Sequence, residues 1–438
     1  MSKTPLIDAL KELKHDRYHM PGHKGVRPEG FPDAFEIDFT EINKTGNLFL
    51  EDGPIFESET LYREYFGAKQ CIYLTGGSTQ GILTAIFTLK PKKMLCDRNS
   101  HKALSNALGL CNVTPIFINP EINLEYDVPD IISSVKIEEK LTENSDIDAV
   151  FITSPNYFGI YSDVEKIANV CHKKGVKLIV DEAHGCHFPS ICIKNAITCG
   201  ADIAITSAHK TTDCLGQGAV LLARDTNLSL RRNSSIFGTS SPSYLIMASI
   251  EMALKNTYLY KEMPQKCHKL RENIEKNTKF SVLKHENLDP CRLTINTKNV
   301  NITGDELHKI LEEELSIVPE MSDLFNVVFI MTPRDENLDY LLESLIKISE
   351  KIEKKDFKEL KYEIIEPKMQ ITPHEAMFSE KKSAKLVESV GKISGQIVAP
   401  YPPGVPIIYP GEIILQEHIE YMRKMCYNQY EEIYIIEN

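Results

Sequence analysis

Three features are scarce or missing in this sequence, and each absence excludes a class of protein. The 438-residue chain has no apolar run near the ~18 residues of a membrane-spanning helix, so we expect no membrane partner. It contains 50 lysines and arginines and 62 aspartates and glutamates, which gives a net charge of −12. This negative charge argues against broad nucleic-acid binding, which needs a basic surface. Its 11 cysteines include no C-x-x-C pair, and we interpret them as reduced thiols of a cytoplasmic protein.

Short apolar runs are present, and from residue 71 onward they alternate with helical stretches. Because the runs are apolar throughout, they are typical of strands buried on both faces. Their alternation with helices indicates an α/β domain with a mostly parallel sheet. One helix is expected after Ser162, its predicted N-cap. The expected strands cover residues 71–74, 93–97, 115–119, 148–153, 176–181, 201–207 and 218–223.

The sequence divides into four regions. Residues 1–60 are predicted to form an N-terminal helix and an extended arm rich in glycine and proline, and residues 61–262 the large domain. A long helical pattern runs from about residue 243 to residue 277. Residues 263–365 are predicted to form a smaller α+β domain, and residues 366–438 a C-terminal segment with a proline-rich loop.

Three polar motifs directly follow apolar runs, where ligands collect in an open α/β sheet. The first is TGGSTQG, residues 75–81, which precedes an expected helix. Its small residues and free N–H groups would hold a phosphate, and Ser78 and Thr79 would add hydroxyl donors. The same residues also fit a simple strand-to-helix turn.

The other two motifs contribute an acid and an amine. In DEAHG, residues 181–185, Asp181 needs a partner if it is buried: a protonated ring nitrogen, or a structural lysine or arginine. A helicase would also need a G-x-x-x-x-G-K-[ST] loop, which the sequence lacks. In SAHK, residues 207–210, Lys210 is either a surface residue or a desolvated amine that attacks an aldehyde.

Together the motifs match the three recognisable parts of pyridoxal 5′-phosphate. A phosphate cradle, an acid for a pyridinium and an amine for an aldehyde follow one another along the same domain. A metal site is not expected, because His184, Cys186 and His187 fit no zinc spacing well.

With these residues placed, the chain resembles the Orn/Lys/Arg decarboxylase family, in particular its short bacterial arginine decarboxylases. The resemblance covers nearly the whole chain. It implies an α/β, fold type I (aspartate aminotransferase-like) large domain with a smaller α+β domain, and a homodimer or dimer-based assembly. It is carried by YHMPGHKG (18–25), GPIFESE (53–59), GGSTQG (76–81), RNSHKA (98–103), SPNYFG (154–159), DEAHG, SAHK, TSSPSYLIMAS (239–249), SDLFNVVF (322–329) and PYPPGVPIIYPGE (400–412).

The resemblance also implies roles for single residues. Lys210 would bond to the cofactor aldehyde, Asp181 would pair with the pyridine nitrogen, and His101 would stack on the ring, unless it merely caps a helix. Glu412 would hold the distal cation of the substrate, and residues 239–241 would reach the phosphate of the neighbouring subunit. The remaining cofactor contacts would be Gly77, Ser78, Thr79, Ala183, His184, Ser207 and His209.

The chain departs from the family pattern at a few positions. Relatives often have threonine where Gly77 stands, and Asp213 and Gly216 interrupt a lysine loop that is more apolar elsewhere.

The expected activity is decarboxylation of a basic L-amino acid, first of all arginine to agmatine in polyamine metabolism. Lysine and ornithine remain open as substrates. Two alternative functions also remain open: another reaction on the same fold, such as transamination or aldol cleavage, and a non-catalytic scaffold. A product assay distinguishes the reactions, because carbon dioxide and an amine form together only in decarboxylation. If the purified protein showed no absorbance of the bound cofactor, the scaffold hypothesis would be favoured.

Overall fold

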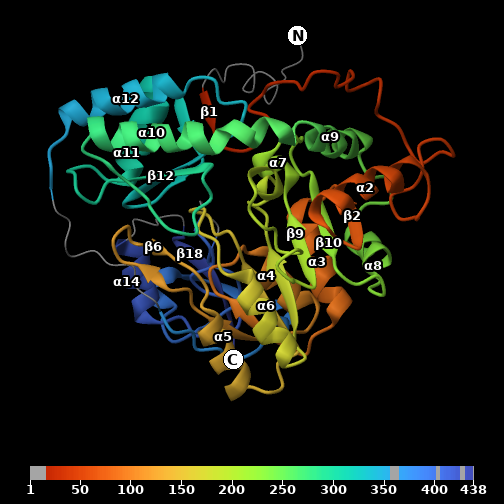
Figure 1. Cartoon of the computed structure of the whole chain (residues 1–438). Coiled ribbons are helices and arrows are strands. Elements are labelled where there is room, and N and C mark those ends of the chain that lie inside the picture. Colours follow the sequence, from red (N-terminus) through yellow and green to blue (C-terminus); the bar gives the residue numbers. More distant parts are fainter. Residues whose placement is uncertain (1–15, 356–364, 401–404, 425–429, 438) are drawn as a thin grey trace, which may run out of the picture.

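The computed structural model describes residues 16–355, 365–400, 405–424 and 430–437. Figure 1 shows a central sheet flanked by helices, a second layered unit formed by α10, α11, α12 and β12, and a C-terminal unit in blue. The expected N-terminal helix lies outside the described residues, as do residues 401–404 of the proline-rich loop. Within the described ranges, no helix combines the length and apolarity needed to cross a membrane.

The large sheet confirms all of the predicted strands. Its order is β2-β10-β9-β8-β7-β3-β4, and only β10 runs antiparallel to its neighbours, so the sheet is mostly parallel. Both faces are covered, which explains why the strands carry continuous apolar runs. The strands are β2 (Gln70–Leu74), β3 (Lys93–Asp97), β4 (Thr114–Ile118), β7 (Ala149–Thr153), β8 (Lys177–Asp181), β9 (Ile203–Thr206) and β10 (Ala219–Ala223).

The polar motifs converge because neighbouring parallel strands end at one edge of this sheet. Thr153 is in register with Asp181, and Asp181 with Ile205. The residues that follow these strand ends, and those that follow β2 and β3, therefore lie along one edge. A short antiparallel pair, β5 (Ile122–Asn123) and β6 (Val128–Pro129), is separate from the large sheet.

Helices of the large domain differ from the sequence predictions at three places. Asp163, not Ser162, caps α6: Asp163 Oδ1 accepts the Lys166 amide at 3.0 Å, while Ser162 Oγ accepts the Ile132 amide. Helix α2 begins at Gly53, so the extended arm ends before residue 60. The helical pattern predicted at 243–277 is broken into α9 (Tyr244–Lys255), η2 (Thr257–Glu262) and α10 (Met263–Asn277).

The remaining helices of the large domain are α2 (Gly53–Phe66), α3 (Gly77–Leu89), α4 (Ala103–Leu110), α5 (Ser134–Glu143), α6 (Val164–Lys173), η1 (Phe188–Ile191), α7 (Ala208–Thr211) and α8 (Leu230–Phe237).

The smaller unit is an antiparallel sheet of order β11-β12-β15-β14 with helices packed on it, as the sequence predicted for an α+β domain. The N-terminal arm joins it through β1 (Asp16–Tyr18), which pairs with β13 (Ile317–Pro319), and the Tyr18 ring packs edge-on against Phe329. Its elements are β11 (Ser281–Val282), β12 (Arg292–Asn296), α11 (Gly304–Leu315), β14 (Met321–Ser322), β15 (Asn326–Ile330) and α12 (Leu338–Lys351).

The C-terminal segment forms a third sheet, of order β16-β18-β17, with its own apolar cluster that includes Val398, Ile408 and Ile414. The division into four regions remains a prediction, although each of these sheets falls within one of them. The elements are α13 (Pro373–Phe378), β16 (Lys381–Lys385), η3 (Leu386–Glu388), β17 (Ile393–Ser394), α14 (Gln416–Lys424) and β18 (Glu432–Ile436).

A buried ion pair docks the C-terminal segment on the large domain. Arg98, just after β3, donates from Nη1 and Nη2 to the two carboxylate oxygens of Glu412 at 2.6 and 2.9 Å. Arg98 Nη2 also donates to the Ile407 carbonyl, and its guanidinium lies over the rings of Phe117 and Tyr409. Because Glu412 is fully buried, loss of its charge would leave a guanidinium in a dry environment without a counter-charge.

Glu412→Gln should therefore destabilise the protein by about 3 kcal/mol, as expected for breaking a buried ion pair by removing one partner. Glu388→Gln, which removes an exposed carboxylate of the same segment, should change stability by less than about 0.5 kcal/mol. Urea unfolding followed by circular dichroism measures both. Equal midpoints for the two variants would show that the pair contributes nothing to docking.

Candidate active site

Lys210 lies at the carboxyl edge of the sheet, on the one-turn helix α7 that follows β9. Its Nζ is 3.1 Å from His184 Nε2 and 5.9 Å from the centre of the Tyr157 ring. The side chain is only half-buried, which leaves an accessible side for a ligand. Burial nevertheless lowers the pKa of Lys210, and Asp181, followed by Glu320, opposes this decrease. The amine is therefore more easily deprotonated than that of a surface lysine.

His184 connects Lys210 to a second buried cation. Its Nδ1 is 3.0 Å from Arg292 Nη2, and arginine only donates, so Nδ1 must accept. Burial holds the pKa of His184 well below its usual value, so the ring is neutral and carries its proton on Nε2. Nε2–H then donates to Lys210 Nζ, which accepts only as a neutral amine. The hydrogen-bond geometry and the lowered pKa of Lys210 agree.

Asp181 ends β8 and is buried beside this amine. Its Oδ1 accepts the Ala183 amide at 3.1 Å. Burial raises the pKa of Asp181, whereas Lys210 lowers it, so the two side chains lie close enough to influence each other. A carboxylate held in this way favours a second cation, such as a protonated ring nitrogen.

Two further histidines face the same space. Burial, with a smaller contribution from Lys210, lowers the pKa of both His101 and His209 to about 4. His101 Nδ1 accepts the amide of Ala103, the first residue of α4, at 3.2 Å, while Lys102 is the N-cap residue; the stacking role of His101 remains a prediction. His209 Nδ1 lies 3.1 Å from the Gly218 carbonyl and must donate to it. Both rings also lower the pKa of His184, which places the three histidines around Lys210.

The TGGSTQG motif forms the start of α3, as predicted. No side chain caps this helix, and Ser78 and Thr79 are half-buried in its first turn. Gly77 has a φ of 72°, a conformation that would strain a threonine at this position. Ser207 Oγ, between β9 and α7, is buried without a hydrogen-bond partner. These unsatisfied donors fit an anion of phosphate type, as pyridoxal phosphate would require.

The YHMPGHKG arm packs against the lysine helix. The Gly22 amide donates to the His209 carbonyl at 2.8 Å, and Thr332 Oγ1 donates to the Gly22 carbonyl at 3.0 Å. A Cβ at Gly22 would lie 2.7 Å from backbone atoms of Thr211 and Thr212, so no larger residue fits without displacing the helix. The motif therefore contributes to the position of Lys210.

Sequence reasoning missed two charged residues of the site. Arg292 begins β12 and is fully buried, yet its Nε and Nη1 have no hydrogen-bond partner. Glu320 accepts the Met20 amide at 2.9 Å. Burial lowers the pKa of both Lys210 and Arg292, and Glu320 opposes both decreases. Arg292 is flanked by apolar residues in CRLTINTK, and nothing in that pattern separates it from an ordinary strand residue.

Other predicted positions have different surroundings. Both carboxylate oxygens of Glu412 are bound by Arg98, which leaves no free oxygen for a substrate cation and argues against the predicted substrate role. Asp213, the departure in the lysine loop, pairs with Arg334 through its Nε and Nη2. Residues 239–241 are exposed, and their predicted contact with a neighbouring subunit remains a prediction.

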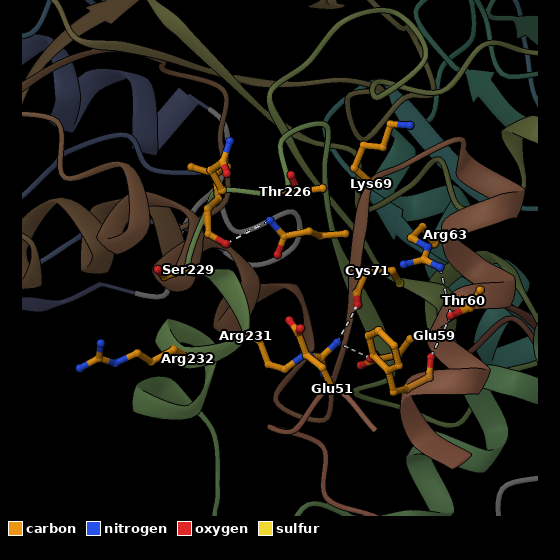
Figure 2. Close-up of a pocket in the computed structure, with 14 residues that line it drawn as sticks. Glu51, Glu59, Thr60, Arg63, Lys69, Cys71, Thr226, Ser229, Arg231 and Arg232 are labelled. Atoms are coloured by element: carbon orange, nitrogen blue, oxygen red, sulfur yellow. Dashed lines mark hydrogen bonds and ion pairs between the residues drawn. The ribbon is translucent and has the colours of Figure 1, made fainter. Parts of the chain in front are cut away.

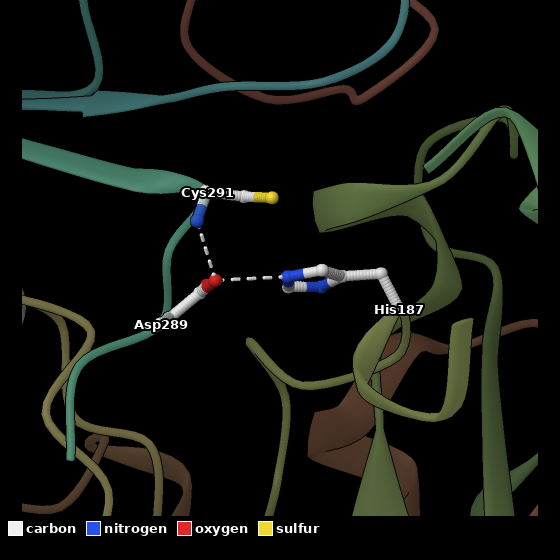
Figure 3. Close-up of side chains that lie close together, drawn as sticks. All are labelled: His187, Asp289 and Cys291. Carbon is white, nitrogen blue, oxygen red and sulfur yellow. Dashed lines mark hydrogen bonds and ion pairs between the residues drawn. The ribbon is translucent and has the colours of Figure 1, made fainter. Parts of the chain in front are cut away.

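A buried cluster of His187, Asp289 and Cys291 lies beside the site (Figure 3). Asp289 Oδ1 accepts from His187 Nε2 at 3.1 Å and from the Cys291 amide at 2.8 Å. Burial raises the pKa of Asp289, but His187 and Arg292 together outweigh that effect and keep it below its usual value. The carboxylate therefore already has hydrogen-bond donors from both sides, and the cluster fixes the loop after DEAHG against the smaller domain.

Comparisons with known proteins agree with this geometry. Residues 4–287 match the family "Orn/Lys/Arg decarboxylase, major domain", and residues 352–431 match its C-terminal domain. The chain is 32% identical to the arginine decarboxylase of Bacillus subtilis (strain 168), with 96% of this chain and 93% of that protein aligned. It is 31% identical to the arginine decarboxylase of Halalkalibacterium halodurans, again over 96% and 93%.

Similarity to lysine decarboxylases is lower in sequence but extends to structure. The constitutive lysine decarboxylase of Escherichia coli is 22% identical, with 96% of this chain and 76% of that protein aligned. Its solved structure superimposes with a TM-score of 0.77 at 20% identity, covering 99% of this chain and 82% of that chain. The fold is thus fold type I, as the sequence predicted, and the chain belongs to the Orn/Lys/Arg decarboxylase family.

Proposed function

We propose that this protein decarboxylates L-arginine to agmatine with pyridoxal 5′-phosphate as cofactor. The observation that carries the proposal is that His184 joins a neutral Lys210 to an unsatisfied Arg292, while the buried Asp181 lies close enough to Lys210 to influence it. When bound, the cofactor supplies an electron-accepting ring for the electron pair released as carbon dioxide leaves. The protein supplies orientation, charge and proton positions.

The cofactor would be held by three groups of this chain. Lys210 offers a deprotonated amine for its aldehyde. Asp181 would keep the ring nitrogen protonated, since burial raises the pKa of its carboxylate and the protonated nitrogen would supply the positive partner that a buried carboxylate needs. The open start of α3 at residues 77–79, together with Ser207, binds the phosphate. Ala183, His184 and His209 line the same space, and His101 would lie against the ring.

The substrate would be oriented by charges of both signs. The two unpaired donors of Arg292 would bind the substrate carboxylate next to Lys210. Glu320 is the second carboxylate, after Asp181, that acts on Lys210, and we assign it in place of Glu412 to the distal cation. A guanidinium suits such a carboxylate because it donates in a planar fork. His184 and Lys210 are both placed to hold the proton that replaces carbon dioxide.

Arginine is preferred over lysine and ornithine because the arginine decarboxylases cited above are about 30% identical, against 22% for the lysine enzyme. The deciding experiment incubates the cofactor-loaded protein separately with arginine, lysine and ornithine and measures carbon dioxide and the amine product. Agmatine and carbon dioxide in equal amounts from arginine support the proposal. Product from lysine or ornithine alone would reassign the substrate, and a keto acid without carbon dioxide would reassign the reaction.

We further propose a cytoplasmic homodimer that acts in polyamine metabolism. The exposed 239–241 segment supports the dimer, because these polar residues follow α8 and are available to a second subunit.

Lys210→Ala should abolish both turnover and the visible absorption band of the lysine-bound cofactor, because no other residue takes over the covalent anchor. Lys194→Ala, which removes an exposed lysine, should leave both unchanged. Absorption spectra and agmatine release measure the two effects. An unaltered spectrum in Lys210→Ala would contradict the anchor assignment.

Cofactor capture should reach its maximum rate at a pH below the ordinary lysine pKa of about 10.4. Burial lowers the pKa of Lys210, so the reactive neutral amine is already dominant at lower pH than in a solvated lysine. Stopped-flow absorbance after mixing apoprotein with pyridoxal phosphate at a series of pH values gives the profile. A rate that keeps rising beyond pH ~10.4 would mean that Lys210 behaves as an ordinary lysine.

Glu320→Gln should raise the KM for arginine roughly tenfold or more, as expected for loss of a charged hydrogen-bond partner, with a smaller change in kcat. Glu314→Gln, at an exposed position of α11, is the matched control. Initial rates of agmatine formation distinguish them. An unchanged KM in Glu320→Gln would remove this residue from the substrate site.

A further inference from the structure

A second charged pocket lies at the opposite edge of the large sheet. It has a volume of about 420 Å³ and is formed by α2, the start of β2 and the segment before α8 (Figure 2). The predicted phosphate cradle (TGGSTQG) follows Leu74, the last residue of β2. Lys69 and Gln70, which line this second pocket, lie at the start of the same strand. The two sites are thus separated by the length of a strand.

Arg231 forms the floor of this pocket and is buried. Its Nη2 donates to Glu59 Oε2 at 2.6 Å, and its Nη1 donates to the Leu48 carbonyl at 2.7 Å. Its Nε has no hydrogen-bond partner, and the carboxylate nearest to it, that of the exposed Glu51, is 3.9 Å away. A buried guanidinium N–H without a partner is costly, and it points to a missing acceptor.

Among the charged residues that line the pocket, cations outnumber anions. Arg63, Lys69 and Arg232 accompany Arg231, against Glu51 and the already paired Glu59. Arg63 makes only a long contact with Thr60, at 3.4 Å. Ser229, the N-cap residue of α8, makes no side-chain capping bond. The Leu230 amide donates to the Leu228 carbonyl at 2.8 Å, so the first-turn amides left for a ligand are those of Arg231 and Arg232. A helix start, a buried unsatisfied donor and flexible cations together are the components of an anion site.

From these features we infer that the pocket between α2 and α8 binds a small phosphate-bearing anion. The group would accept from Arg231 Nε and from the Arg231 and Arg232 amides of α8, with Arg63 and Lys69 as further cationic contacts. The volume leaves room for a ligand larger than inorganic phosphate, whose remaining part would extend toward Thr226 and Asn227.

The pocket is connected to the proposed cofactor site through α8. Ser234, one turn after Arg231, accepts from Gln80 Nε2 through both its carbonyl and its hydroxyl at 3.2 Å. The Gln80 side chain in turn accepts the Gly76 amide at 3.0 Å, within the phosphate cradle. An anion that fixes the start of α8 would therefore also stabilise the cradle, a consequence that rests on the proposed function.

Isothermal titration calorimetry of the cofactor-loaded protein with inorganic phosphate tests the inference. The wild-type protein should show saturable binding at millimolar phosphate. The double variant Arg63→Ala/Lys69→Ala should bind at least roughly tenfold more weakly, since two charge-assisted contacts are lost. Arg231→Lys, which keeps the charge that Glu59 requires but removes the Nε donor, should weaken binding as well.

The control is Lys136→Ala/Lys347→Ala, which removes the same charge from two exposed positions elsewhere and should bind like the wild type. Absence of saturable binding in the wild type, or equal binding by both double variants, would overturn the inference. Any phosphate that enters an empty cradle is unaffected by these variants. The difference between them therefore reports the second pocket even if the proposed cofactor does not bind.

Discussion

The contact between Lys210 and His184 sets the chemical state of the site. Arg292 cannot accept a hydrogen bond, so it fixes the tautomer of His184, and His184 in turn requires a neutral amine at Lys210. Removing the charge from Lys210 also lowers the cost of keeping Arg292 buried nearby. One hydrogen-bonded chain therefore accounts for both a reactive lysine and a guanidinium with free donors.

This arrangement depends on parts of the chain that are far apart in sequence. The N-terminal arm contacts the lysine helix through Gly22, the smaller domain supplies Arg292, and Asp289 of that domain holds the loop after DEAHG through His187. The C-terminal segment contributes Glu412, which binds Arg98 only three residues before His101. The arm and the PGE loop are thus explained by the parts of the site that they hold in place.

The sequence predicted the central sheet and its ligand-binding edge well, because continuous apolar runs and strand-end polar residues are local signals. Lys210, Asp181 and His184 could be found in this way. The pairing of Glu412 with Arg98 was not predicted, because this contact spans 314 residues and leaves no trace in the local sequence pattern. The break in the predicted helix at 243–277 depends on packing. The cap of α6 was misplaced by one residue because Ser162 and Asp163 are both good N-cap residues and adjacent in sequence. Arg292 was missed because burial of a single arginine in a strand cannot be read from its neighbours.

The central claim, that the neutral amine of Lys210 captures the cofactor, is tested most directly by chemical trapping. The protein is loaded with pyridoxal phosphate, reduced with borohydride, digested and analysed by mass spectrometry. The account predicts one reduced pyridoxyl phosphate per chain, on the peptide that contains Lys210. An adduct on a different lysine, or a protein that carries no adduct after loading, would contradict it.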